Sequence, residues 1–136
     1  MLAAIEILMP HRAPMRFIDA LTECTETTAR AHAHFTADHF AVADGAVLES
    51  ALVECLAQTI AAALGYRARA SGTTGASNHG MLAAVSNFKI HARPPLDQLL
   101  IIEVREVKRL GPMLLIAGII ACADQLIASG ELSLYA

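Results

Sequence analysis

The stretch AVLESALVECLAQTIAAALGY, from Ala46 to Tyr66, decides the fold of this chain of 136 residues. It contains about nineteen residues that favour a helix. Asp44 is placed to cap the start of this helix, and Gly65 is placed to end it as the glycine beyond its last turn. Its side chains are apolar almost all round, so other elements must cover the helix on most sides.

The segments after this helix have the pattern of strands joined by short turns. The loop-rich stretch Ser71–Gly80 separates them from the helix. Four strands are predicted, at about residues 79–92, 98–110, 112–123 and 126–135.

Before the helix, Pro10 stops a short helix that is predicted over Leu2–Leu8. One strand is predicted around Met15–Leu21, and another over Ala29–Thr36, where apolar and polar residues alternate. One long helix with a meander of antiparallel strands predicts an α+β fold, the hot-dog arrangement, in which an antiparallel sheet wraps around one central helix. Because the length suits one domain and is too short for two, we expect residues 1–136 to form a single domain.

The composition is unusually apolar. Hydrophobic residues make up 55% of the chain and charged residues only 17%, which excludes a disordered chain. Such a domain is expected to hide apolar surface in a subunit interface or a lipid-like cavity. The net charge is −3 and the Lys and Arg residues are scattered, so we expect no binding to nucleic acid or to an anionic membrane.

The cysteines and the N-terminal sequence indicate a cytoplasmic protein. The three cysteines show no CxxC spacing, so we predict reduced thiols rather than a disulfide framework or a zinc site. The N-terminus lacks the positive region of a secretory signal. A membrane span over the long helix is not expected, because Glu49 and Glu54 would be costly in lipid.

Glu54 is the first candidate for chemistry. Ser50, Glu54 and Gln58 are spaced four residues apart and form one polar stripe on the helix. A carboxyl group on a buried helix must be paired, neutralised or face a cavity, and a desolvated carboxylic acid can act as a proton donor near neutral pH. The alternative is that the stripe faces solvent or a subunit interface.

His39 is the second candidate, in the loop Ala37–Gly45 just before the helix. Loops that enter a helix N-terminus collect functional groups because backbone N–H donors point there. A lone histidine is more often structural, which is the alternative here. His11 follows Pro10 in a turn, where a structural hydrogen-bonding role is favoured over a catalytic one.

The other histidines are weaker candidates. His32 and His34 lie two apart on the polar face of a strand, which is half of a metal site without a third ligand, so solvated surface is the favoured interpretation. His91 is expected on the outer face of the sheet and His79 in the loop. We expect no metal and no cofactor.

Three segments resemble a known family. LMPHRAPMRFID (Leu8–Asp19), VECLAQTIAAALGY (Val53–Tyr66) and MLAAVSNFKIHARPPLDQLLIIEV (Met81–Val104) are similar, in the right order, to motifs of the beta-hydroxyacyl-ACP dehydratases. PHRAPM, the helix around Glu54 and GYRARASG resemble most closely the divergent dehydratase-like proteins of aryl-polyene pathways. The resemblance implies a hot-dog fold and an obligate dimer. Its implied substrate is a 3-hydroxyacyl thioester on the phosphopantetheine of acyl carrier protein.

The resemblance also implies roles for individual residues. In the family a histidine acts as base toward the α-hydrogen and a carboxylic acid assists departure of the 3-hydroxyl, across the dimer interface. Glu54 matches the carboxylic acid and His39 the histidine. The loop departs from the family motif: Asp38 and Ala41 replace a glycine and a proline. Substrate-binding roles are expected for the remaining candidates, Phe40, Gly45 and Gln58.

Three functions follow as hypotheses. The first is a 3-hydroxyacyl-ACP dehydratase that forms a trans-2-enoyl thioester in fatty-acid or polyene biosynthesis, with His39 and Glu54 as catalytic residues. The second is a catalytically weak subunit that binds acyl carrier protein or an active dehydratase paralogue. The third is an acyl-thioester hydrolase on the same fold. The expected assembly is a homodimer or a heterodimer with another hot-dog subunit.

Overall fold

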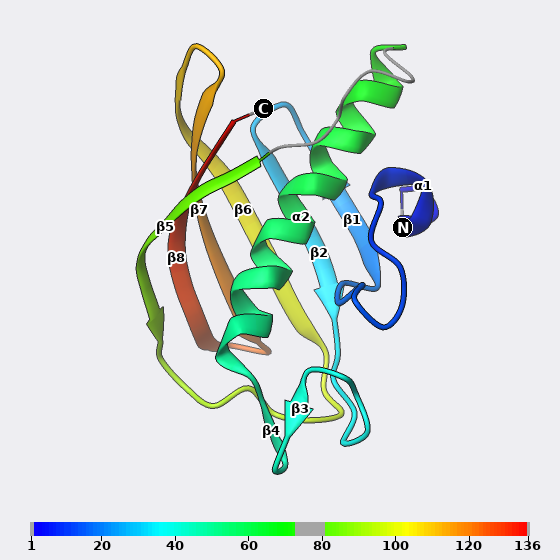
Figure 1. Cartoon of the computed structure of the whole chain (residues 1–136), viewed down its shortest axis with the longest axis vertical. Coiled ribbons are helices and arrows are strands. Elements are labelled where there is room, and N and C mark those ends of the chain that lie inside the picture. The colour runs from blue at the N-terminus through cyan, green and yellow to red at the C-terminus, as the bar shows by residue number, and fades with distance from the viewer. Residues whose placement is uncertain (1, 73–80, 136) are drawn as a thin grey trace.

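The computed structural model describes residues 2–72 and 81–135, so most of the predicted loop Ser71–Gly80 lies outside the described residues. A long helix, α2 (Glu49–Ala70), lies across one face of a curved antiparallel sheet (Figure 1). This is the predicted α+β hot-dog arrangement. No helix among the described residues is long and apolar enough to cross a membrane.

The main sheet has six strands in the order β1-β2-β6-β7-β8-β5. The four strands predicted after the helix are all present, within a few residues of their predicted ends. The strands of the sheet are β1 (Ala20–Cys24), β2 (Thr28–Ala33), β5 (Met81–Ile90), β6 (Leu100–Leu110), β7 (Met113–Cys122) and β8 (Gln125–Tyr135).

The sheet turns alternate side chains toward α2. In β7 the buried residues Leu114, Ile116 and Ile120 share one face, because side chains of a strand alternate between its two faces. A side chain at Gly118, on the same face, would meet the Leu56 side chain of α2. The apolar excess of the sequence therefore fills the space between helix and sheet.

The first strand begins later than predicted. Residues around Met15–Asp19 were expected in it, yet β1 begins at Ala20. The backbone N–H groups of Phe17 and Ile18 donate to the side chain of Gln58 instead of a neighbouring strand. A side chain on α2 thus replaces the strand pairing of this segment. The next strand, β2, ends at Ala33, three residues short of the predicted Thr36.

The start of the long helix also differs from the prediction. Residues 46 and 47 form β4 (Ala46–Val47), which pairs with β3 (Val42–Ala43) in a small hairpin. Asp44 and Gly45 make its two-residue turn, both with positive φ, which glycine and aspartate tolerate best. Asp44 therefore does not cap the helix; Leu48 is the N-cap residue, without a side-chain hydrogen bond.

The end of the helix shows why Gly65 is needed. The helix continues past it to Ala70, so the prediction that Gly65 ends the helix is wrong. A Cβ at Gly65 would lie 1.9 Å from the carbonyl oxygen of Leu8. Leu8 belongs to α1 (Ile5–Leu8), which is shorter than the predicted Leu2–Leu8 and packs beside α2 at the β1 edge (Figure 1). The missing side chain of Gly65 leaves room for this crossing and does not end the helix.

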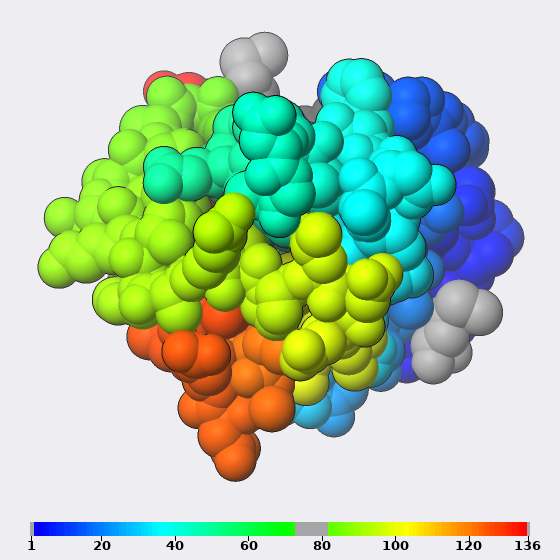
Figure 2. All heavy atoms as spheres, turned by 90° about the horizontal axis from the view of Figure 1, so that it is seen from below, coloured from blue at the N-terminus to red at the C-terminus, as the bar shows by residue number. Residues whose placement is uncertain are grey.

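The loop that leaves β2 packs against the segment between β5 and β6. The backbone N–H of Asp97 donates a hydrogen bond of 2.8 Å to the carbonyl of Phe35. Figure 2 shows this end of the molecule, where the cyan loop before α2 lies beside the yellow-green segment. The loop that carries His39 is therefore held against the rest of the fold.

Candidate functional site

The polar stripe of α2 is present, and its three side chains differ in burial. Ser50 is exposed, the Glu54 side chain is 38% exposed, and Gln58 is fully buried. The stripe runs from solvent into the contact between α2 and the segment before β1. Within one chain, Glu54 is half-buried rather than enclosed.

Both the oxygen and the nitrogen of the Gln58 side-chain amide form hydrogen bonds within the chain. Its Oε1 accepts hydrogen bonds from the backbone N–H groups of Phe17, at 2.8 Å, and Ile18, at 3.3 Å. Its Nε2 donates to the carbonyl of Met15, at 2.8 Å, and to Oε1 of Glu54, at 3.2 Å. Through these hydrogen bonds, Gln58 holds residues 15–18 and one oxygen of Glu54 in place. A direct contact of Gln58 with substrate stays a prediction.

His11 lies beside Glu54. The sequence did not indicate that these two residues are neighbours. Its Nε2 is 3.5 Å from Oε1 of Glu54, and its Nδ1 is buried without a hydrogen-bond partner among the described residues. The turn around Pro10 favoured a structural role for His11. One feature of the sequence could have indicated a role for His11 in the site: it belongs to the segment Leu8–Asp19, which resembles a motif of the dehydratases.

His39 lies in the loop between β2 and β3, with its ring edge-on to two phenylalanines. The ring centroids of Phe35 and Phe17 are 4.7 and 5.6 Å from that of His39. Desolvation there lowers the pKa of His39 below 6.5, and the charge of Asp19 partly opposes this effect. A lowered pKa favours the neutral ring at pH 7.

One hydrogen bond determines where the neutral ring of His39 carries its proton. The backbone N–H of Ala41 donates to Nδ1 of His39 at 2.9 Å. Because Nδ1 accepts this bond, its lone pair is used and the proton of the neutral ring lies on Nε2. In this arrangement Nε2 of His39 is a hydrogen-bond donor.

The chain does not bring His39 and Glu54 into contact. No hydrogen bond, ion pair or ring contact joins the two side chains among residues 2–72 and 81–135. The charged groups that act on His39 are Asp19, His34 and Asp38. Phe17 connects the two indirectly, since its N–H bonds to Gln58 and its ring contacts His39.

The two other predicted substrate-binding residues lie on the loop side of the site. Phe40 follows His39 and is 61% exposed. Gly45 lies in the turn of the β3–β4 hairpin, where its positive φ gives it a conformational role. Contact of either residue with substrate stays a prediction.

The remaining histidines show no metal site in the described part of the chain, where no group of three His, Cys, Asp or Glu residues could hold a metal ion. His34 pairs with Asp19, with 2.8 Å between Nδ1 and Oδ2. Nε2 of His91 lies 2.8 Å from the hydroxyl of Ser129. His79 lies outside the described residues. The three cysteines are free thiols.

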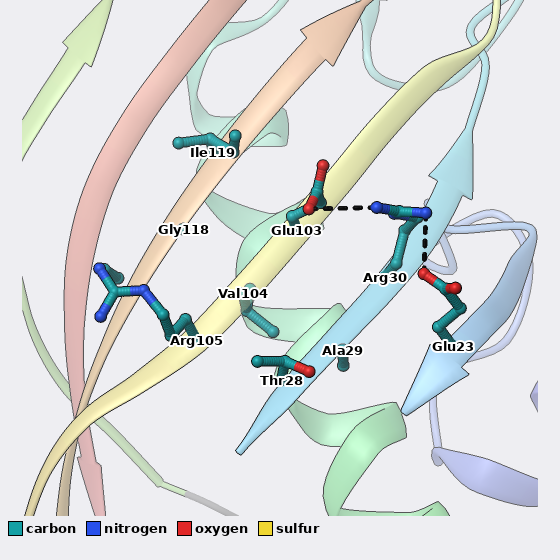
Figure 3. Close-up of a pocket in the computed structure, with 10 residues that line it drawn as sticks. Glu23, Thr28, Ala29, Arg30, Glu103, Val104, Arg105, Gly118 and Ile119 are labelled. Carbon is teal, nitrogen blue, oxygen red and sulfur yellow. Dashed lines mark hydrogen bonds and ion pairs between the residues drawn. The ribbon is translucent and has the colours of Figure 1, made fainter. Parts of the chain in front are cut away.

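A separate cleft of about 420 Å³ lies where strands β1, β2, β6 and β7 run side by side. Figure 3 shows Arg30 between two carboxylates, with Glu23 at 2.8 Å and Glu103 at 3.4 Å. The two carboxylates compensate the guanidinium charge, and no histidine or cysteine is among the described residues that line this cleft. It therefore offers no alternative to the site around Glu54.

Comparisons with known proteins identify the family of this chain. The sequence pattern of the ApeP-like family, described as ApeP dehydratase, matches residues 3–136. The chain belongs to the ApeP-like dehydratase family. The family predicted from the three motifs is thereby confirmed. A comparison of this ApeP-like chain with curated proteins finds no match.

Solved structures share the fold of this ApeP-like chain. The dehydratase heterocomplex ApeI:P from Xenorhabdus doucetiae has a TM-score of 0.86 at 19% identity, over 98% of this chain and 90% of that chain. The thioesterase superfamily protein RHA08564 has a TM-score of 0.64 at 21% identity, over 88% of this chain and 55% of that chain. The E. coli PaaI protein of the phenylacetic acid degradation operon has a TM-score of 0.68 at 9% identity, over 85% of this chain and 81% of that chain. These likenesses establish the hot-dog fold.

Proposed function

We propose that this chain eliminates water from a 3-hydroxyacyl thioester carried on the phosphopantetheine of acyl carrier protein and releases a trans-2-enoyl thioester. The observation that carries the proposal is Glu54. In a chain of a dehydratase family, it is a carboxyl group on the central helix with Oε1 fixed by Gln58 and Oε2 without a hydrogen-bond partner among the described residues. Elimination of water removes a proton from the α-carbon and delivers a proton to the hydroxyl that leaves the neighbouring β-carbon, and Oε2 is free to carry out both transfers.

The proposed step uses Glu54 for both proton transfers. Oε2 of the carboxylate takes the α-hydrogen as a proton, and the electron pair of the C–H bond moves toward the thioester carbonyl to form an enolate. When the enolate collapses, the α,β double bond forms and the C–O bond to the 3-hydroxyl breaks. The hydroxyl takes the proton from Oε2 and leaves as water, and the carboxylate is restored.

His39 is proposed to stabilise the enolate. The resemblance assigns the histidine as base, but a base at Nε2 requires a lone pair there, and the Ala41 N–H places the proton of the neutral ring on Nε2. We therefore propose that Nε2–H of His39 donates to the thioester oxygen. Since His39 and Glu54 make no contact within residues 2–72 and 81–135, we propose that the two residues act on one substrate from different subunits.

The space beside Glu54 is compatible with an acyl chain. Ala57 and Ala61 follow Glu54 on the same face of α2, and both line a small apolar cavity of about 40 Å³. This volume is little more than the ~30 Å³ of one water in the liquid, so a longer acyl chain needs additional space between two subunits. The cavity is lined by Ala57, Ile60, Ala61, Leu82, Leu132 and Leu134.

The second subunit is proposed to pair along β5. Within the described part of the chain, this strand is an edge of the sheet and pairs with β8 alone. Leu82 and Val85 are 44% and 39% exposed on it. A long edge with exposed apolar side chains is a surface for strand pairing with another chain. The partner is proposed to be a hot-dog subunit, either a second copy or a paralogue.

The alternative function is a weakly active subunit that completes the site of an active paralogue. Two observations favour it. The loop of His39 departs from the family motif at Asp38 and Ala41, and the similar structure from Xenorhabdus doucetiae is a heterocomplex.

Product analysis tests these functions. The purified protein is incubated with a 3-hydroxyacyl thioester on acyl carrier protein, alone and with a second hot-dog dehydratase. Absorbance of a conjugated enoyl thioester with the protein alone is the expected result. Turnover only in the mixture would establish the partner-subunit function. Release of free thiol without an enoyl product would contradict both and establish an acyl-thioester hydrolase.

A further inference from the structure

His11 is held in place by its own segment, between α1 and β1. The guanidinium of Arg12 donates to the carbonyl groups of Glu6, Met9 and His11. Farther along the segment, the carbonyl of Met15 accepts a hydrogen bond from the side-chain amide of Gln58. The segment is thus fixed at both sides of His11, whose side chain is 32% exposed.

The Glu54 carboxylate has one occupied oxygen and one free oxygen. Nε2 of Gln58, at 3.2 Å, and Nε2 of His11, at 3.5 Å, both approach Oε1. Oε2 has no such neighbour among the described residues. When a carboxyl group is protonated, its proton occupies the oxygen that faces no donor. Two N–H groups directed at Oε1 therefore keep the proton of Glu54 on Oε2.

The ring of His11 is suited to this task as a donor through Nε2. An ionised carboxylate accepts hydrogen bonds only, so Nε2 must carry the proton to interact favourably with Oε1. Nδ1 is buried without a partner.

We infer that His11 is a positioning residue for Glu54: together with Gln58 it holds Oε1 and confines proton transfer to Oε2. This inference rests on the proposed function, since it assigns a role to a residue behind the proposed acid–base group. His11 does not touch the substrate in this role and acts only through Glu54.

Three substitutions of His11 separate this role from a structural one. The side-chain nitrogen of Gln lies as many bonds from the backbone as Nε2 of His, whereas that of Asn corresponds to Nδ1. His11→Gln is therefore expected to keep kcat within about threefold, while His11→Asn and His11→Ala lower it about 10- to 100-fold with little change in KM. His32→Gln and His32→Ala, on β2 away from Glu54, are the matched controls.

The Glu54→Gln background supplies the decisive comparison. If His11 acts through Glu54, His11→Ala causes no further loss of kcat in Glu54→Gln. Equal losses in both backgrounds, or equal rates of His11→Gln and His11→Ala, would overturn the inference.

A spectroscopic measurement separates the inference from the proposed function. The ring-nitrogen NMR shifts of His11 should show the proton on Nε2 and a bare Nδ1. Glu54→Gln should move the Nε2 resonance, and Glu49→Gln, exposed five residues earlier on the same helix, should not. A proton on Nδ1, or an Nε2 resonance unchanged in Glu54→Gln, would overturn the inference. If the wild type dehydrates no thioester, the proposed function fails, and this measurement still decides whether His11 holds Glu54.

Discussion

The backbone N–H of Phe17 donates a 2.8 Å hydrogen bond to Oε1 of Gln58, 41 residues away in sequence. The ring of the same phenylalanine lies edge-on to His39. One residue thus connects the helix that carries Glu54 to the loop that carries His39. The placement of both candidate groups depends on this connection.

Replacing Gln58 should destabilise the fold more than replacing another buried polar residue of α2. Gln58→Leu leaves the N–H groups of Phe17 and Ile18 and the carbonyl of Met15 without their partner. Buried groups that lose their partner cost about 1–3 kcal/mol, so we expect a loss of about 2–4 kcal/mol in the free energy of unfolding. Urea unfolding at a fixed protein concentration measures it.

Thr59→Val is the matched control for Gln58→Leu. Thr59 is equally buried, but among residues 2–72 and 81–135 its hydroxyl donates only to the carbonyl of Cys55, one turn earlier in the same helix. We expect this variant to lose less than about 1 kcal/mol. Equal losses in the two variants would show that the hydrogen bonds of Gln58 to the segment before β1 contribute no more stability than the bond of Thr59 within its helix.

Gly65→Ala should be destabilising, although alanine normally stabilises a helix interior by about 0.5–1 kcal/mol relative to glycine. The new Cβ would lie 1.9 Å from the carbonyl oxygen of Leu8, so α1 must move away. Overpacking of this kind costs about 1–3 kcal/mol in the free energy of unfolding. Ser50→Ala, at an exposed position of α2, is the control that gains helix propensity without a clash. A Gly65→Ala protein as stable as wild type would contradict the close approach of α1.

The pKa of His39 should lie below 6.5 in the folded protein, because desolvation of the ring disfavours its charged form. The charges of Asp19 and Asp38 oppose the shift, and that of Asp19 is the larger effect. Asp19→Asn should therefore lower the pKa of His39 further, and by more than Asp38→Asn does. NMR titration of the ring measures all three values, and a wild-type value at or above 6.5 would contradict the packing against Phe17 and Phe35.

The same shift predicts a pH dependence of stability. Between the lowered pKa of the folded protein and the unfolded value near 6.5, the unfolded chain binds more protons, so stability rises with pH in that window. His39 thus contributes a loss of stability as pH falls through 6.5 toward the folded pKa. His39→Gln should show a smaller loss over this range in urea unfolding. An unchanged pH slope would indicate that the ring is equally hydrated in both states.

The proposed site between subunits predicts recovery of activity in mixed dimers. Glu54→Gln and His39→Ala should each be nearly inactive as homodimers. If one substrate uses His39 of one subunit and Glu54 of the other, a dimer of the two variants contains one intact site. Co-expression should restore up to about half of the wild-type turnover per mixed dimer. Absence of recovery, with mixed dimers isolated, would place both residues in one chain or require a different partner.

The elements of the fold were predictable because their patterns are local. Apolar residues all round α2 and alternating residues in β7 reveal the helix and the strands without knowledge of their neighbours. The ends of the elements were less predictable because distant residues set them. Gly65 is explained only by Leu8 of α1, and the late start of β1 only by Gln58 of α2.

In the candidate site, too, some features were predictable from the sequence and others were not. Glu54 was predictable, since a polar stripe on an apolar helix is visible in the sequence. The position of His11 beside Glu54 was not, because 43 residues separate them and the contact depends on the path of the segment after α1. The proton on Nε2 of His39 likewise depends on a single hydrogen bond from Ala41, which the loop sequence does not indicate.

The most direct test of the account is the turnover of Glu54→Gln with a 3-hydroxyacyl thioester. The amide keeps the shape of the side chain but can no longer take a proton from the substrate. We expect kcat to fall by about 10²- to 10⁴-fold while the urea midpoint stays near that of wild type. Glu49→Gln, which removes the same charge from an exposed position of α2, should keep the wild-type rate. Wild-type turnover by Glu54→Gln would contradict the account.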